Sequence, residues 1–405
     1  MLTNTAPKRR DASFHAIKSE HAESSIRKGL DKGIVTEKDA DLIREFVASL
    51  QSCHDIGLGR TNKLVFTLVG WRRFTGPFES LTIRGIQEGI SRLKGAKSER
   101  GTPFKKNTIY DFVSILKQFV LWMIENEYLA IPEAKVRKIQ TPRKDMMTRV
   151  AGDLLTPDEI TAMVRACTRS MDRAVIMMLY EGGFRIGELG ALCWRDLKFD
   201  QYGIVANVDF KTGKPRYIRL IMAREHLAKW QNDYPFTPEG DALVFISERK
   251  TPLTHAAVQK QLKRIAERAG IEKHITPHVF RHSRITHLIQ QGVPESVIKQ
   301  VMWGNTSTNM IQTYSHLTGT DIDHEMLKLY GITNGGKEIE TARLEPRQCE
   351  SCFIVNAPTS NFCNGCGRPL VESVQSTLDE KELLARNSPM YRELLDMLKK
   401  DLKAK

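Results

Sequence analysis

The chain has 405 residues, of which 41% are hydrophobic and 27% charged, and its formal net charge is +13. This length predicts two or three domains, and the composition is that of a soluble globular protein. The positive charge favours a polyanionic partner, although a need for solubility alone would also produce it. No apolar stretch is long enough to cross a bilayer and the N-terminus lacks the apolar core of a secretory signal, so we expect no membrane partner and a reducing, cytoplasmic compartment.

The first part of the chain is predicted to be helical. Residues 1–19 are polar and predicted to form a flexible N-terminus, whereas residues 20–130 carry helical patterns throughout. Thr36 and Asp39 form a capping pattern in front of one helix. Between Ile109 and Met123 apolar side chains recur at steps of three and four, which predicts an amphipathic helix of about four turns.

A basic loop that contains glycine and proline lies before this last helix, and a basic linker follows it over residues 131–155. The loop is suited to a phosphate backbone, but a solvated loop has the same composition, and neither interpretation is favoured. The candidate DNA-binding cations are Arg92, Lys94, Lys97, Arg100, Lys105 and Lys106 in the loop and Arg143 and Lys144 in the linker.

A second domain is predicted over residues 156–333. It opens with a capping box in which Thr156 is followed by a proline and by Glu159. Helical patterns continue to about residue 194, and strands follow at 203–210 and 215–222, joined by a hairpin, with 242–247 as a possible third strand. Helices then return as far as residue 330. The fold class is therefore mainly α with a small antiparallel β-sheet, and this second domain is of the α+β class.

Several polar residues in this domain are spaced in a way that core packing does not require. Arg185 follows a pair of glycines and opens a helix, and Lys211 lies at the tip of the predicted hairpin. His278 and Arg281 share one face of a helix that Thr276 caps.

A tyrosine, Tyr314, follows that helix in a short helical segment. With these residues the stretches GGFRIGEL, DFKTGKPRYIRL, TPHVFRHSRITH and VIKQVMWGNTSTNMIQTYSHL resemble the tyrosine recombinase family of phage-type integrases. The resemblance covers residues 156–330 well, and residues 20–130 only as a basic helical shape. It implies a helical core-binding domain that clamps DNA, followed by a catalytic domain.

The chemistry of this residue set agrees with that family. Two guanidiniums, on Arg185 and Arg281, can donate paired hydrogen bonds to the oxygens of a phosphodiester as charge builds on them. Tyr314 would supply the nucleophilic oxygen and form a covalent phosphotyrosine. The resemblance assigns to Lys211 the proton for the leaving sugar hydroxyl, and His278 would exchange a proton with the tyrosine. No metal is needed for these steps.

Two further positions match the family only in part. Glu188, three residues after Arg185, is expected to orient the basic site rather than to react. Nine residues before Tyr314 the family has a histidine or tryptophan that donates to the phosphate, and this chain has Asn305. An asparagine amide can donate a hydrogen bond but cannot shuttle a proton, and the neighbouring Trp303 is the alternative donor.

Four cysteines form a separate motif after the catalytic domain. Cys349 and Cys352 form one pair, Cys363 and Cys366 form another, and ten residues separate the pairs. This spacing predicts a structural zinc ribbon over residues 345–371, with a redox role as the less favoured alternative.

Beyond the ribbon, residues 376–405 form a predicted helical tail with an apolar stripe. Tyr391 is a second tyrosine to weigh as nucleophile, but its place in that stripe favours packing.

Together these features predict a cytoplasmic, nucleoid-associated, site-specific DNA recombinase of a mobile genetic element, with a 3′-phosphotyrosyl intermediate. The resemblance implies double-stranded DNA as partner and a homo-tetramer assembled on two DNA sites. Zinc would be the only cofactor, with none for catalysis. The rival hypotheses are DNA relaxation like that of a type IB topoisomerase and a catalytically weakened DNA-binding regulator.

Overall fold

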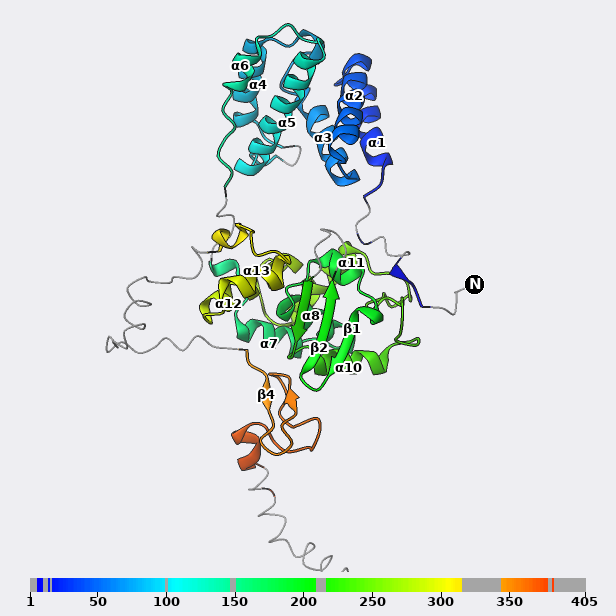
Figure 1. The fold of residues 1–405 in the computed structure, drawn as a ribbon, viewed down its shortest axis with the longest axis vertical. Coiled ribbons are helices and arrows are strands. Elements are labelled where there is room, and N and C mark those ends of the chain that lie inside the picture. The colour runs from blue at the N-terminus through cyan, green and yellow to red at the C-terminus, as the bar shows by residue number, and fades with distance from the viewer. Residues whose placement is uncertain are drawn as a thin grey trace, which may run out of the picture. The chain divides into compact units, whose positions relative to one another are not determined.

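The computed structural model of the chain describes residues 6–9, 14, 17–98, 101–145, 151–208, 216–314, 344–377 and 381. The chain divides into two compact units (Figure 1). The N-terminal unit is residues 16–148, and the C-terminal unit combines residues 1–15 with residues 149–405. No helix of the described segments is both long and apolar enough to cross a membrane.

Helices account for the regular structure described in the N-terminal unit, as the sequence predicted. The expected capping box is confirmed, because Thr36 Oγ1 accepts from Asp39 N and the Asp39 side chain accepts from Thr36 N. Large side chains such as Phe46, Trp71 and Phe119 are fully buried between the helices. The elements are α1 (Glu20–Asp31), α2 (Glu37–His54), α3 (Leu58–Trp71), the short 3-10 helix η2 (Phe78–Ser80), α4 (Ile83–Gly95), α5 (Lys106–Glu125) and α6 (Glu133–Arg137).

The predicted linker over residues 131–155 is in fact structured at both ends. Helix α6 places Val136 in the core of the N-terminal unit, and Lys117 Nζ donates to the carbonyl of Arg137 at 2.7 Å. At the other end Leu155 is fully buried in the C-terminal unit, where its N–H donates to Ser283 Oγ at 2.8 Å. Isolated apolar side chains in a basic segment gave the sequence analysis no periodicity to detect.

Helices surround a small sheet in the C-terminal unit, and the capping box of Thr156 and Glu159 is confirmed at its first α-helix. Its helices are η3 (Ala151–Asp153), α7 (Pro157–Arg165), α8 (Ser170–Glu181), α9 (Ile186–Gly190), η4 (Trp194–Asp196), α10 (Arg224–Asp233), α11 (His255–Arg268), α12 (Pro277–Gln290), α13 (Glu295–Trp303) and η5 (Met310–Thr313). Its strands are β1 (Leu197–Asp200), β2 (Gly203–Val208) and β3 (Arg216–Leu220), followed by β4 (Arg347–Gln348) and β5 (Val355–Asn356) near the C-terminus.

The three-stranded sheet is antiparallel in the order β1-β2-β3, with Leu197 opposite Ala206 and Ile204 opposite Leu220. The two predicted hairpin strands are confirmed over the described residues 203–208 and 216–220. Strand β1 was missed, because four residues are too few for a detectable alternation. The proposed third strand at 242–247 is wrong: this segment makes only isolated bridges, such as that between Cys193 and Leu243.

A buried carboxylate joins the sheet to the helix that leads into the candidate site. Glu181, the last residue of α8, is buried and accepts hydrogen bonds from the backbone N–H groups that follow β3, those of Ile221, Met222 and Ala223, at 2.7–2.9 Å. Burial raises the pKa of this carboxyl group. These hydrogen bonds hold the end of α8 in place, and with it the start of the turn that leads to Arg185.

The N-terminal segment corrects the prediction of a flexible N-terminus over residues 1–19. Its described residues 6–9 and 14 lie against the C-terminal unit, and Phe14 is buried in the core of that unit. One buried aromatic ring in a polar stretch carries no periodic pattern, so its burial could not be predicted from the sequence.

Within the C-terminal unit, the cysteine-containing segment contacts the first turn of α10. The carboxylate of Glu225 accepts from Ala357 N at 3.3 Å and from Ser360 Oγ. Strands β4 and β5 pair antiparallel, with Gln348 opposite Val355. Most of the tail predicted over 376–405, including Tyr391, lies outside the described residues.

Candidate active site

A tight turn at the end of α8 places the first candidate residue. Gly183 adopts a φ of 54°, and a Cβ there would lie 2.5 Å from the sulfur of Met302, so both the backbone conformation and the space require glycine. Arg185 then stands at the N-cap of α9 and is about one-third exposed. The side chain of Glu188, one turn later, accepts from Arg185 N at 2.8 Å and from its Nη1 at 2.7 Å. Glu188 therefore holds Arg185 through both backbone and side chain.

A second arginine that the sequence analysis missed shares this carboxylate. Arg216, the first residue of β3, is 2% exposed and forms an ion pair with Glu188. Its Nη1 also donates to the carbonyls of Val301 and Met302 at 2.9 Å each. The available clue was that an arginine occupies the inward-facing side of an alternating strand. Arg216 thus connects α9, β3 and the end of α13.

Arg281 lies on α12 and completes a group of three buried or partly buried guanidiniums. It is 5% exposed, donates to the carbonyls of Gly183 and Met302, and lies over the Trp303 ring at 5.3 Å from the ring centre. Burial, followed by the charges of Arg216 and Arg185, lowers the pKa of Arg281 to about 9. Glu188 acts in the opposite direction. The cations exceed the carboxylate here, which favours an anionic ligand.

Tyr314 follows η5 and is packed into this neighbourhood. Its side chain is 3% exposed, and its ring centre lies 5.2 Å from that of His282 and 6.2 Å from that of Trp303. Burial raises the pKa of Tyr314 to about 12, although Arg281 and Arg185 oppose the shift. The phenol is therefore protonated at neutral pH, and a nucleophilic role requires a group that takes its proton.

Two histidines on α12 are the nearest candidates for that group. His278 is exposed in the first turn, and its ring centre is 6.3 Å from that of His282. His282 was not singled out in the sequence, yet its ring contacts that of Tyr314. The cap expected at Thr276 is absent from this helix, because its Oγ1 makes no capping bond, although the proline at the first position is present.

The remaining predicted positions are Asn305, its alternative Trp303, and Lys211. Asn305 is half-buried, and its Oδ1 accepts from Ser307 N at 3.0 Å and from Ser307 Oγ at 2.8 Å, so this oxygen is used in a local turn. Trp303, the alternative, contacts both Arg281 and Tyr314. Lys211 lies outside the described residues.

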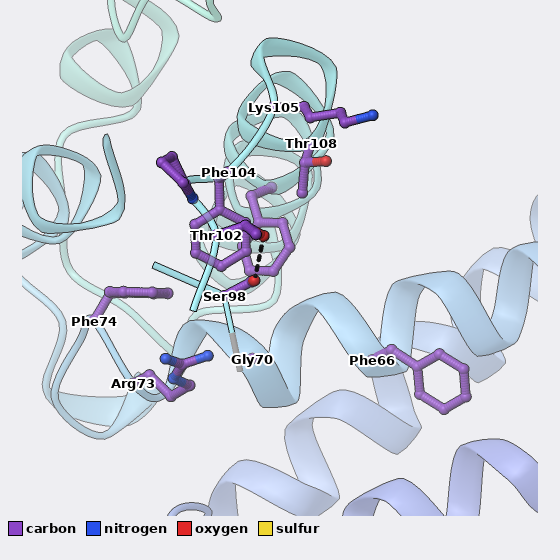
Figure 2. A pocket seen from close by; sticks show the side chains of 11 residues that line it. Phe66, Gly70, Arg73, Phe74, Ser98, Thr102, Phe104, Lys105 and Thr108 are labelled. Atoms are coloured by element: carbon purple, nitrogen blue, oxygen red, sulfur yellow. Dashed lines mark hydrogen bonds between the residues drawn. The ribbon is translucent and has the colours of Figure 1, made fainter. Parts of the chain in front are cut away.

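The candidate DNA-binding cations of the N-terminal unit are exposed where they are described. The loop between α4 and α5 closes with a bridge between Lys97 and Pro103 and a hydrogen bond of 3.0 Å between the hydroxyls of Ser98 and Thr102. Figure 2 shows this loop beside an open pocket of about 640 Å³, to which Lys105 contributes. The exposed cations of the predicted set are Arg92, Lys94, Lys97, Lys105, Lys106, Arg143 and Lys144, and Arg100 lies outside the described residues.

The four cysteines of the C-terminal motif converge. Their Sγ atoms all lie within 4.8 Å of one another, with 3.5 Å between Cys349 and Cys366 and 3.4 Å between Cys352 and Cys363. A tetrahedral zinc site with Zn–S bonds of about 2.3 Å has its sulfurs just under about 4 Å apart, so the set fits such an ion. The N–H of Gly365 points at Cys363 Sγ at 3.4 Å, as expected for a thiolate ligand.

The comparisons with known proteins agree with this arrangement. Residues 153–320 match the model of the phage integrase family. The tyrosine recombinase XerC of Xanthomonas campestris pv. campestris is 27% identical over 302 residues, which cover 71% of this chain and 86% of that protein.

Solved structures of low identity show the same fold. Lambda integrase bound to DNA superposes with a TM-score of 0.54 and 16% identity, covering 70% of this chain and 99% of that one. A lambda integrase tetramer bound to a Holliday junction gives 0.52 and 17%, covering 67% and 78%. Residues 153–320 thus match the phage integrase family, and the chain is similar to tyrosine recombinases, enzymes that break and rejoin DNA.

Proposed function

We propose that this enzyme carries out site-specific recombination through a covalent 3′-phosphotyrosyl intermediate, with Tyr314 as the nucleophile. The observation that carries the proposal is the convergence of Arg185, Arg216 and Arg281 near a buried tyrosine with Glu188 as the shared carboxylate. Such a group is short of negative charge, and a DNA phosphate supplies it.

Each step of the reaction can be assigned to a residue. The Tyr314 oxygen attacks phosphorus and forms the phosphotyrosyl bond, while the bond from phosphorus to the 5′ oxygen breaks. His278 accepts the tyrosine proton, with His282 beside the ring. Arg185 and Arg281 bind the non-bridging oxygens as their charge grows. By resemblance, Lys211 protonates the leaving 5′ oxygen, and the reverse sequence on a second strand restores the DNA.

The role of Asn305 follows from how its amide is held. Because Ser307 occupies Oδ1, the amide nitrogen is left to donate to a phosphate oxygen. Trp303 lies over the guanidinium of Arg281, which fits a positioning role for the indole. Glu188 likewise orients Arg185.

The partners and the metal follow the same reasoning. We propose that both units bind double-stranded DNA, the N-terminal unit through its exposed cations, and that four copies assemble on two DNA sites, as lambda integrase does on a Holliday junction. The cysteine cluster would hold one structural zinc ion, which stabilises the ribbon and takes no part in the cleavage.

Trapping the covalent intermediate tests the mechanism. The substrates are duplexes of random sequence that carry a nick. Cleavage beside the nick releases a short strand with the 5′ hydroxyl that religation needs, so the protein stays attached. Sequencing the attached DNA then identifies the site. We expect covalent complexes with the wild-type chain and with the matched control Tyr391→Phe, but none with Tyr314→Phe. Complexes formed by the Tyr314→Phe chain would contradict the proposal.

The same DNA separates the rival functions. A recombinase exchanges strands only when two sites are present, whereas relaxation like that of a type IB topoisomerase needs one. A regulator without catalysis would bind the duplex and form no covalent complex at all. The family match over residues 153–320 and the intact arginine group favour recombination.

A further inference from the structure

The N-terminal segment is attached to the C-terminal unit by its backbone. We call its described residues, 6–9 and 14, the strap. Pro7 O accepts from Leu243 N at 2.9 Å, and Lys8 forms an antiparallel bridge with Ala242. Because Leu243 also bridges to Cys193, the strap adds a third extended segment to a small irregular ladder.

Side chains of the strap add specific contacts. Arg9 forms an ion pair with Asp196, and its Nε donates to the carbonyl of Ala191 at 3.0 Å. The same carboxylate accepts from Cys193 N at 2.8 Å, so Arg9 binds a group that is already held in place. The Arg9 side chain remains 30% exposed, so water can reach this contact.

Phe14 makes the deepest contact. Its ring lies directly on Gly190 at the end of α9, where a Cβ would come within 2.0 Å of the ring, and its carbonyl accepts from His255 N at 3.2 Å. The ring is 7% exposed. The strap therefore packs on the short helix whose N-cap is the active-site residue Arg185.

The chain consequently passes between the two units twice. The first connection is short because the strap is fixed to the C-terminal unit close to where the N-terminal unit begins. Phe14 is fixed in the C-terminal unit, whereas the carbonyl of Lys18 accepts from Asn62 Nδ2 at 3.1 Å in the N-terminal unit. Four residues reach at most about 14 Å. The other passage runs from Asp145, which Asn107 holds, to Leu155, and its ten residues reach about 35 Å.

We propose that the strap is a releasable second tether between the two units, which prolongs their joint hold on DNA while Phe14 is seated on Gly190. The inference rests on the proposed function, in which both units bind one duplex. While the strap is docked, the four-residue connection between Phe14 and Lys18 keeps a unit that has dissociated from DNA close to it, so the unit rebinds. With the strap released, only the ten-residue passage remains.

The size of the effect follows from the two lengths. Effective concentration falls roughly as the −3/2 power of tether length, so going from four to ten residues lowers it about fourfold. We therefore expect DNA to leave the strap-released enzyme about four times faster, because rebinding becomes correspondingly rarer.

Two substitutions release the strap in different ways, and each has a matched control. Arg9→Glu places a carboxylate against Asp196 at a partly exposed contact, and Arg9→Lys keeps the charge. Phe14→Asp puts a charge into the apolar site on Gly190, and Phe14→Leu keeps it apolar. Hydrogen exchange at the Leu243 N–H, which bonds to the strap, confirms release. All variants also carry Tyr314→Phe, so no covalent link can delay DNA release.

The measurement is the dissociation rate of a fluorescein-labelled duplex after a challenge with unlabelled DNA. We expect the Arg9→Glu and Phe14→Asp chains to release it about fourfold faster than the parent, and both controls to match the parent. Unchanged release from a chain whose Leu243 exchange shows an undocked strap would overturn the tether. Equal acceleration in Phe14→Leu and Arg9→Lys would overturn it too. If the parent chain binds no duplex, that result would instead contradict the proposed DNA-binding function.

Discussion

Replacing Arg216 by methionine tests whether the buried ion pair supports the active site. The guanidinium is 2% exposed, and its loss leaves Glu188 with a single cationic partner. It also removes the donor to Val301 O and one of the two donors to Met302 O. Methionine is close to arginine in length, so the change removes charge and hydrogen bonds more than volume.

The magnitude can be worked from these contacts. Breaking a buried ion pair by removing one partner costs about 3–5 kcal/mol, and here the lower end applies, because Arg185 still pairs with Glu188. In a unit of this size about 1 kcal/mol lowers the melting temperature by roughly 2–4 °C, so we expect a fall of roughly 6–12 °C. Loosened support for Arg185 and Arg281 should also slow covalent-complex formation at least about tenfold, which corresponds to about 1.4 kcal/mol.

Calorimetry of the C-terminal unit's transition and the rate of covalent trapping are the two measurements. Arg219→Met is the matched control: Arg219 lies on the same strand and pairs with Asp200, but both side chains are about one-third exposed. An exposed pair is worth at most about 1 kcal/mol, so the control should melt within about 4 °C of the wild type. If the Arg216 and Arg219 variants melt together, the buried pair does not stabilise the site.

Further predictions address charge, salt and metal. Burial lowers the pKa of Arg281 to about 9, so kcat/KM for covalent trapping should fall as the pH rises through about 9. The substitution Glu188→Gln removes a charge that raises this pKa, so it should move the fall in kcat/KM to lower pH. Lys105→Gln and Lys106→Gln should each reduce the slope of log affinity against log salt by about 1, measured by fluorescence anisotropy, and an unchanged slope would remove that lysine from the interface. Metal analysis should find zinc in the wild type but not in Cys363→Ser, and both should still form covalent complexes; loss of trapping with the metal would assign zinc to the chemistry.

The sequence was sufficient for the parts of the fold that repeat or carry a local code. Capping at Thr36 and Thr156 marked two helix starts, and the alternation around residues 203–220 marked a hairpin. It was insufficient where a single contact decides the structure. Val136 and Phe14 each bury one side chain from a polar segment, and no period or motif distinguishes such a residue from an exposed one.

The candidate site shows the same division. Arg185, Arg281 and Tyr314 stand in motifs with a recognisable spacing, and the structure brings them into one neighbourhood. Arg216 lies within the stretch DFKTGKPRYIRL but was not singled out there, because its role depends on a partner 28 positions away on another element. His282 was not singled out in the sequence, unlike His278 one turn earlier on the helix, and only the packing around Tyr314 reveals its ring contact.

The balance of charge in this site explains why catalysis can proceed without a metal. Three guanidiniums lie near one carboxylate, which pairs with Arg185 and Arg216, and burial together with the charges of these two arginines lowers the pKa of Arg281. A bound phosphodiester reduces the repulsion among the three guanidiniums. The attraction between the phosphodiester and the cations grows as negative charge builds on its oxygens during attack, because charges interact more strongly in a water-poor site. The repulsion among these cations is overcome when the protein folds, and the negative charge of Glu188 reduces it. In the proposed reaction these residues would therefore bind the transition state more tightly than the substrate, which is what Tyr314, a neutral phenol at neutral pH, would require as the nucleophile.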